Sequence, residues 1–251
     1  MDINSKQFRV TMLLTMCLLS VPSSLSKASH KRVVHHKAVH KSTAGVVTWY
    51  ANEVTHRAHQ RHGTYAPVSY VHNFYGGNNG SAGDYLSQMG GESRWPQGKN
   101  IRVYVAPGRA TFPGIISNCM NQWASASGHH FSWSLTGDPS SADYTIGWTS
   151  HQTEVSSGTE AGLTTTDTSV DPDTGMEYIE HAKTHILTRY EGKTLSDAEL
   201  EKTALHEVGH ALGLEGHSSN PTDIMYYAVS RRQSGTLTGR DRNTMARLYS
   251  E

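Results

Sequence analysis

The sequence predicts an α+β fold, in which a twisted mixed sheet of about five strands packs against helices. Between residues 101 and 188, short segments alternate apolar and polar residues, which is typical of strands. Other segments repeat apolar residues every three or four positions, which is typical of helices with one buried face. The chain of 251 residues is long enough for one such domain with an N-terminal extension.

Five segments carry the strand pattern. They are residues 101–105, 131–135, 144–148, 162–170 and 177–188. The last two are separated by residues 171–175, whose sequence DPDTG predicts a hairpin turn. Its two aspartates also suggest a calcium loop, but the other oxygen ligands of a calcium site are not evident, so Ca²⁺ is not indicated.

Three segments carry a helical pattern. Residues 113–126 place their apolar side chains on one face. A second helix is predicted to begin at Ser196, because Ser196 and Glu199 form a capping box, and to end at Gly213. A third is predicted near residues 239–249.

The composition excludes a strongly basic or acidic protein. Lysine and arginine number 22, as do aspartate and glutamate, so no charge excess favours a nucleic-acid or membrane-surface partner. Histidine is the exception, with 16 residues, which directs attention to metal-ligand spacing. Cys17 lies in the N-terminal apolar run, so Cys119 would be alone in the mature chain, and its apolar neighbours predict a buried thiol.

Residues 1–28 are typical of a signal peptide. Lys6 and Arg9 precede an apolar run at residues 10–21, and a serine-rich stretch follows. This run is shorter than the ~20 residues that span a bilayer. We therefore expect a secreted or extracytoplasmic protein without a membrane span after signal removal; an uncleaved N-terminal anchor is the alternative.

Residues 29–92 precede the predicted compact domain, which covers residues 93–251. Residues 29–42 are basic and histidine-rich without apolar periodicity, and we expect a solvated linker there. Metal gathering or binding to a cell envelope is the alternative. Residues 43–92 fit a propeptide, an N-terminal extension or a linker.

The second predicted helix contains the sequence His-Glu-Val-Gly-His, which begins at His206. Residues four apart lie on the same face of a helix, so the imidazoles of His206 and His210 can reach one zinc ion. Glu207 is rotated away from that face and can reach a zinc-bound water without being a ligand. This spacing predicts a zinc site with a neighbouring base.

Residues after this helix make the prediction of a catalytic zinc site more specific. Gly213 lets the chain leave the helix, and His217 follows as a third zinc ligand. Three protein ligands leave one position for water, as in catalytic zinc sites. Met225 follows at the spacing of a Met-turn.

Residues 206–226 resemble the metzincin metallopeptidases and, within them, the matrixins. The resemblance covers about residues 94–251. Ser218, directly after His217, also fits the matrixin pattern. Weaker matches are RWP at 94–96, the helix with Trp123, ADYTIGW at 142–148, and LTGRDRNTMARLY at 237–249. It implies a metzincin-like zinc peptidase domain, in which the second helix is the active-site helix and a C-terminal helix closes the fold.

The resemblance also implies a zinc-dependent endopeptidase that acts on protein or peptide substrates. Glu207 would be the general base for a zinc-activated water and would pass the proton to the leaving amine. An extended substrate would pair with an edge strand near residues 162–169. Residues around 225–235 would line the pocket beyond the scissile bond. Met225 would form the floor of the zinc site, and Tyr227 would pack there or reach the oxyanion.

This chain departs from the family pattern in two respects. Three residues, where the family has two, separate Gly213 from His217, and we expect Gly216 to absorb the extra residue. The cysteine-containing propeptide segment of many matrixins is not evident, nor is the segment that holds their structural zinc and calcium. Any latency must therefore work differently.

Three other interpretations compete with an endopeptidase. A zinc hydrolase of a non-protein or cell-envelope substrate fits the same motif, which fixes water activation but not the substrate. A non-catalytic, metal-binding secreted protein would not need Glu207. A chance motif is disfavoured because the capping box, Gly213, His217 and Met225 occur together. The sequence does not specify the oligomeric state.

Overall fold

The computed structural model describes residues 29–39, 48–58, 83–89, 92–151, 155, 161–227 and 233–250, the first two segments by their backbone alone. The strands of its main sheet are β1 (Ser29–Val39), β2 (Thr48–Ala58), β3 (Ser93–Arg94), β4 (Asn100–Val105), β5 (Ser132–Leu135), β6 (Tyr144–Thr149), β7 (Gly162–Val170) and β8 (Glu177–Leu187). The helices are α1 (Phe112–Ala126), α2 (Asp197–Ala211) and α3 (Gly239–Leu248), with short 3-10 helices η1 (Leu86–Gln88) and η2 (Pro139–Ser141). A small ribbon consists of β9 (Arg189–Tyr190) and β10 (Lys193–Thr194).

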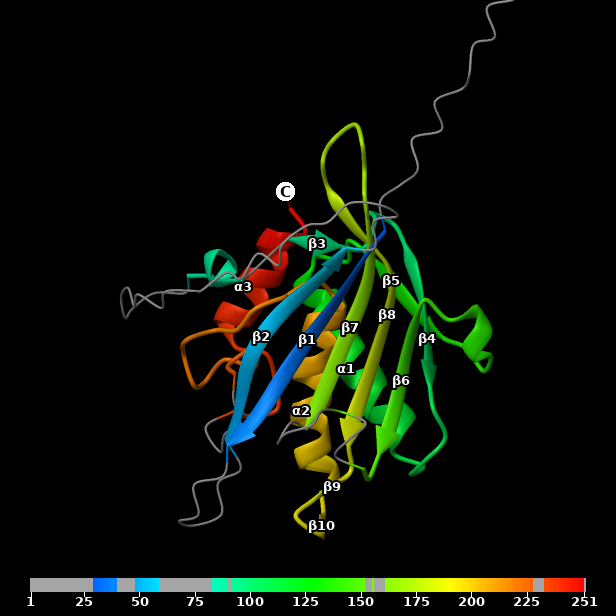
Figure 1. Ribbon diagram of the computed structural model, residues 1–251, viewed down its shortest axis with the longest axis vertical. Helices are drawn as coiled ribbons and strands as arrows, with labels where there is room; N and C mark the ends of the chain where they lie inside the picture. Colours follow the sequence, from blue (N-terminus) through cyan, green and yellow to red (C-terminus); the bar gives the residue numbers. More distant parts are fainter. Residues whose placement is uncertain are drawn as a thin grey trace, which may run out of the picture.

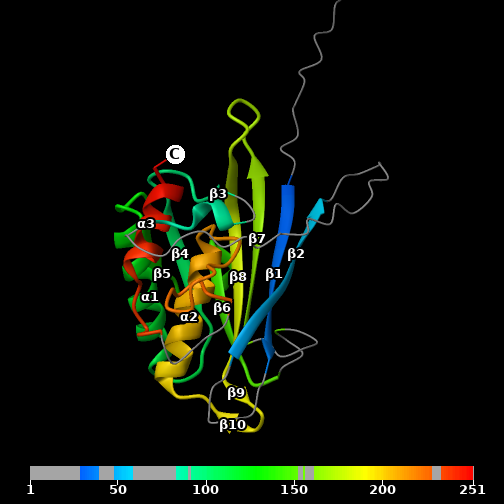
Figure 2. The same cartoon turned by 90° about the vertical axis from the view of Figure 1, so that its left-hand side faces the viewer.

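The sheet is mixed, with the order β2-β1-β7-β8-β6-β4-β5 (Figure 1). β4, β5, β6 and β8 run parallel, whereas β7 runs antiparallel to β8. The three α-helices lie on one side of this sheet (Figure 2). The predicted α+β fold is confirmed, and the five predicted strands correspond to β4 to β8.

The hairpin of β7 and β8 is the part of the sheet nearest to α2. Buried and half-buried residues alternate along most of β7, so one face of this strand packs on the helix. The connecting turn has Gly175 at a φ of +73°, and the Gly175 amide donates to the Asp171 carbonyl at 2.8 Å. The predicted hairpin turn is confirmed.

Helix α2 begins and ends as its sequence predicts. The Ser196 amide donates to the Glu199 carboxylate at 2.7 Å, and the Ser196 hydroxyl accepts from the Glu199 amide at 3.4 Å. Gly213 follows the helix with a φ of +104°. Helix α1 packs against α2, and the Trp123 indole donates to the Leu205 carbonyl at 2.8 Å.

Cys119 of α1 is fully buried, as predicted from its apolar neighbours. Burial raises the pKa of its thiol well above the ordinary value, so the group stays protonated near neutral pH. It acts as a small apolar side chain between α1 and α2, where its Sγ lies 3.8 Å from the Glu201 carbonyl.

Strand β1 lies in residues 29–42, for which the sequence predicts a solvated linker. Strand β2 lies in residues 43–92, which fit a propeptide, an N-terminal extension or a linker. β1 pairs antiparallel with β7, from Ser29 opposite Ser169 to His35 opposite Leu163, and β2 pairs with the other side of β1. The linker prediction was based on the absence of apolar periodicity. Strand pairing uses backbone hydrogen bonds, however, and does not require a periodic apolar pattern. A polar stretch without proline or glycine can therefore extend the edge of a sheet.

A short segment before residue 93 belongs to the main core. Tyr85, Leu86 and Met89 are buried in the cluster that also contains the apolar faces of α1, α2 and α3. No helix of the described residues is long and apolar enough to cross a membrane. The predicted signal peptide, residues 1–28, lies outside the described residues.

Candidate active site

Three imidazoles converge beside β7. His206 and His210 lie one turn apart in the second half of α2, and His217 returns from the following loop. Each offers a ring nitrogen, and these three atoms lie within 4.8 Å of one another. The Nε2 atoms of His206 and His210 are 3.1 Å apart. Ligand nitrogens at ~2.0–2.1 Å from one zinc ion would lie at similar separations.

The surroundings of these histidines keep them neutral. Burial lowers the pKa of His206 to about 4. Burial and the neighbouring histidines hold the pKa of His210 and of His217 well below the ordinary value. Neutral imidazole is the form that binds metal, because protonation blocks the ligand nitrogen.

Backbone carbonyls orient the rings of α2. His206 Nδ1 lies 2.7 Å from the Ile224 carbonyl oxygen, and His210 Nδ1 bonds the Leu214 carbonyl oxygen. A carbonyl only accepts, so each Nδ1 carries the proton and Nε2 keeps its lone pair. Such contacts are typical of zinc-ligating histidines. The donor set, its neutrality and its orientation therefore fit a zinc ion.

The loop that carries His217 is fixed by residues that precede β4. A side chain on Gly213 would overlap the Ser93 carbonyl oxygen. Glu215, one of the three residues between Gly213 and His217, accepts from the Ser93 amide at 3.3 Å. The Gly216 amide lies 3.3 Å from the Met89 Sδ. Gly216 is not among the described glycines with positive φ, so these contacts, rather than its conformational freedom, accommodate the extra residue.

Met225 lies in the turn after His217, where the Met-turn was predicted, and packs against α2. It is fully buried, and a side chain on Gly209 of α2 would overlap its Sδ. The Met225 carbonyl accepts from the Ser218 amide at 2.7 Å, which joins the turn to the residue after His217. Met225 therefore packs against α2; its role as a floor under the zinc site stays a prediction.

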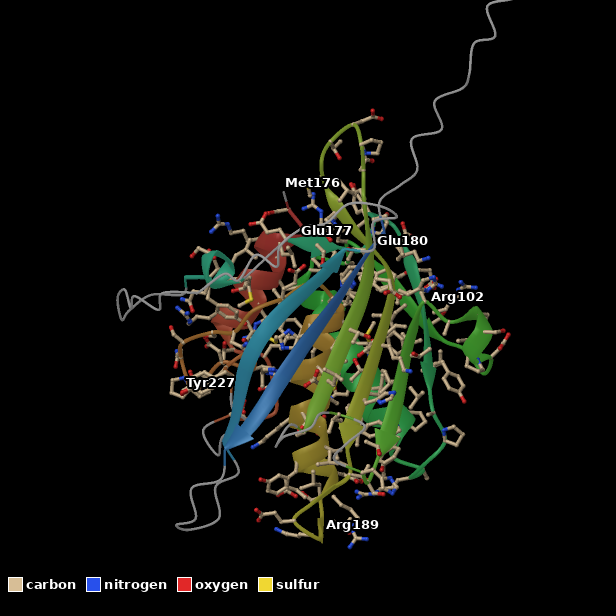
Figure 3. All side chains as sticks on the ribbon, in the orientation of Figure 1. Arg102, Met176, Glu177, Glu180, Arg189 and Tyr227 are labelled. Carbon is tan, nitrogen blue, oxygen red and sulfur yellow. The ribbon has the colours of Figure 1, made fainter. Side chains whose placement is uncertain are left out.

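Tyr227 lies on the segment after the turn, on the left side of the molecule in Figure 3. It is half-buried, and its ring centroid lies 4.2 Å from that of Tyr226. Both rings pack against the core. This contact agrees with the packing role; its role at the oxyanion stays a prediction. Residues 228–232, part of the expected pocket lining, lie outside the described residues.

Glu207 points from α2 to the sheet. Its side chain is 1% exposed, and its Oε2 atom accepts from the Thr164 hydroxyl at 2.6 Å. Gly162 lies against the same carboxylate, which a Cβ at that position would overlap. Sequence reasoning identified Glu207 but missed Thr164, because β7 and α2 are joined only in the fold.

Sequence reasoning also missed two aspartates behind the Met-turn. Asp241 accepts from the Ile224 amide with both carboxylate oxygens at 3.1 Å and from the Tyr85 hydroxyl. Asp223 accepts from Arg240 Nε at 3.0 Å and from the Ser218 hydroxyl. Asp241 has one local signal, because it lies three residues after Thr238 in a capping box.

Comparison with known proteins agrees with this geometry. A family model described as matrixin matches residues 103–250. Metalloendoproteinase 2-MMP of Arabidopsis thaliana is 26% identical over 167 residues, which cover 63% of this chain and 43% of that protein. The chain therefore spans less than half the length of this relative.

Two solved structures of myroilysin are also similar. One has a TM-score of 0.41 at 13% identity and covers 65% of this chain and 98% of the other. The second has a TM-score of 0.38 at 16% identity and covers 64% and 87% of the two chains.

Proposed function

Because this chain belongs to the matrixin family of zinc metallopeptidases, we propose that it is a secreted endopeptidase that cleaves extended segments of proteins. The observation that carries this proposal is the buried Glu207 carboxylate beside three converging imidazoles. A site that only stores or binds metal has no need of that carboxylate. The plant relative is a metalloendoproteinase, which supports a peptide substrate over a non-protein one.

In this proposal His206, His210 and His217 hold the metal. Bound zinc would supply Lewis-acid polarisation of a water molecule and of the scissile carbonyl. Glu207 accepts a proton from the attacking water and returns it to the leaving amine, so the carboxylate ends unchanged. The contacts with Gly162 and Thr164 keep this carboxylate on the sheet side of the site.

The substrate is expected along β7, because an extended peptide can add to the edge of a sheet through backbone hydrogen bonds. That edge is already paired with β1, and the pairing reaches Leu163, next to Gly162. A substrate and β1 would therefore compete for the same backbone groups. We include in the proposal that β1 must leave β7 before an extended substrate binds.

Export is the second part of the proposal. The apolar run at residues 10–21 supports it. Sequencing the N-terminus of chain recovered from the culture medium tests it, since a secreted product would lack residues 1–28.

The test of the activity compares residues 29–251 with the same chain carrying Glu207→Gln. Both are measured for zinc content and for cleavage of casein, an unstructured protein. We expect about one zinc per chain in both, and cleavage only by the parent. The conservative change keeps the size of the side chain, so a loss of cleavage reports the carboxylate.

Two results would count against the proposal. A parent that binds no zinc would remove its central claim. A parent that binds zinc and cleaves no protein, even with β1 disrupted by Val33→Pro, would exclude a general endopeptidase.

A further inference from the structure

A continuous line of hydroxyl groups crosses the sheet and ends on Glu207. The Tyr144 hydroxyl of β6 lies 2.8 Å from the Thr184 hydroxyl of β8. The Thr184 hydroxyl lies 2.8 Å from that of Thr164 in β7, which lies 2.6 Å from Glu207 Oε2. None of these four side chains is more than 1% exposed. They therefore exchange hydrogen bonds with one another in place of water.

The carboxylate sets the direction of every bond in this line. An ionised Glu207 only accepts, so Thr164 donates to it. A hydroxyl has one proton, so Thr164 must then accept from Thr184, and Thr184 from Tyr144. Hydrogen bonds that run in one direction polarise one another and strengthen the last bond of the line. Thr164 also lies 3.2 Å from the Glu207 carbonyl oxygen, which is the more distant acceptor.

The opposite side of the carboxylate is shaped by Gly162. A Cβ on this residue would overlap the Cγ, Cδ and Oε1 atoms of Glu207. Gly162 and Thr164 are both buried and lie two residues apart on the helix-facing side of β7. One strand therefore supplies both the space for the carboxylate and the hydroxyl that binds it.

We propose that Thr164 is a positioning residue for peptide hydrolysis, whose hydroxyl, supported by Thr184 and Tyr144, fixes the orientation of the Glu207 carboxylate. This inference rests on the proposed function, in which Glu207 takes one proton from water and gives it to the leaving nitrogen. Thr164 reaches neither substrate nor metal in this scheme. It fixes which carboxylate oxygen faces the sheet during both proton transfers.

A purely structural role makes a different prediction. In that case, the four buried hydroxyl and carboxyl groups would form hydrogen bonds with one another, and these bonds would serve only the stability of the core. Removing the Thr164 hydroxyl would then lower stability without a specific effect on turnover. A positioning role instead lowers kcat with little change in KM, because the orientation of the base matters in the transition state rather than in substrate binding.

The experiment uses residues 29–251 with zinc and a quenched fluorescent peptide taken from a casein site that the parent cleaves. Thr164→Val keeps the shape and removes the hydroxyl, whereas Thr164→Ser restores it. We expect Thr164→Val to lower kcat about 10- to 100-fold, with unchanged zinc content and KM. Thr164→Ser should recover most of the rate.

Thr203→Val is the matched control. Thr203 is also a buried threonine, in the same helix as Glu207, but its hydroxyl donates to the Glu199 carbonyl at 3.2 Å. We expect kcat to stay at the parent value in this variant. If Thr164→Val does not fold, Thr184→Val replaces it, with a smaller loss of kcat, because Thr164 can still donate to Glu207.

The outcomes separate this inference from the proposed function. An active parent whose kcat is unaffected by Thr164→Val, or by Thr184→Val where that variant replaces it, would overturn the positioning role alone. The same holds if Thr164→Ser is as slow as Thr164→Val. A parent that binds zinc and cleaves nothing would overturn both.

Discussion

The Nδ1 atom of His206 lies 2.7 Å from the carbonyl oxygen of Ile224, so the peptide unit of the predicted Met-turn orients the ring of a candidate metal ligand. The amide of the same Ile224 donates to both carboxylate oxygens of Asp241. Asp241 belongs to α3 and is fully buried. The closing helix therefore helps to fix a ring of α2 through one residue of the turn.

Asp241→Asn should weaken zinc binding. The amide group offers one acceptor oxygen where the carboxylate offers two, so Ile224 and the ring of His206 lose part of their anchor. We expect an affinity loss of about 10-fold, typical of changes behind metal ligands. Competition with a chelator measures it. Asp84→Asn, which removes the same charge from an exposed ion pair with Arg247, is the control; an equal effect of both changes would contradict the prediction.

Gly209→Ala should destabilise the protein although alanine favours helices. The added Cβ would overlap Met225 Sδ and contact the Trp123 ring, and overpacking of this kind costs about 1–3 kcal/mol. Thermal unfolding measures the change in the free energy of unfolding. In the double variant with Met225→Ala, the two losses should be less than additive, because the deletion makes room for the new methyl group. Strict additivity would show that the two sites do not interact.

Asp143→Asn should destabilise the protein at neutral pH and much less in acid. Burial raises the pKa of Asp143, but hydrogen bonds from Arg102 and Lys99 hold it well below the ordinary value. The ionised form is therefore favoured by folding. Its contribution is present above the unfolded pKa, about 3.9, and is lost as pH falls toward the lower folded pKa.

We expect this substitution to lower the free energy of unfolding by about 1–3 kcal/mol at pH 7. The difference from the parent should shrink below pH ~4, which thermal unfolding across pH would record. Asp173→Asn is the control, because Asp173 is exposed in the turn between β7 and β8. A difference for Asp143→Asn that is constant from pH 7 to about pH 3 would refute this account.

Val33→Pro should increase the rate of substrate cleavage. Proline removes one backbone donor in the middle of β1, which pairs with β7 on one side and β2 on the other. Each ~1.4 kcal/mol lost from the free energy of pairing between β1 and β7 raises the fraction of chains with an open β7 edge about 10-fold, until most chains are open. Val33→Thr keeps the donor and should behave as the parent. Unchanged cleavage by a folded Val33→Pro chain would mean that β1 does not compete with substrate.

Local patterns were sufficient to predict most elements between residues 100 and 250. The capping box at Ser196 and the glycine at 213 lie within a few residues of the ends they define. The spacing of His206 and His210 is likewise a property of one helix, so their proximity follows from the sequence.

Contacts between distant segments were not predictable in this way. Thr164 and Glu207 are 43 residues apart, and the threonine-rich sequence of β7 shows an alternating strand without showing what faces it. Tyr85 and Asp241 are 156 residues apart. The pairing of β1 depends on an open edge at β7, which exists only once the sheet has formed.

The close approach of Gly213 to the Ser93 carbonyl sets a limit on how far the N-terminus can be processed. The segment that reaches Gly213 and Glu215 begins upstream, where Tyr85 and Met89 are buried in the core. A protease that cut after Tyr85 would remove a hydrogen-bond donor to Asp241, and one that cut after Met89 would also remove a contact of the His217 loop. We therefore expect any maturation by cleavage to cut before Tyr85 and to leave this segment in place.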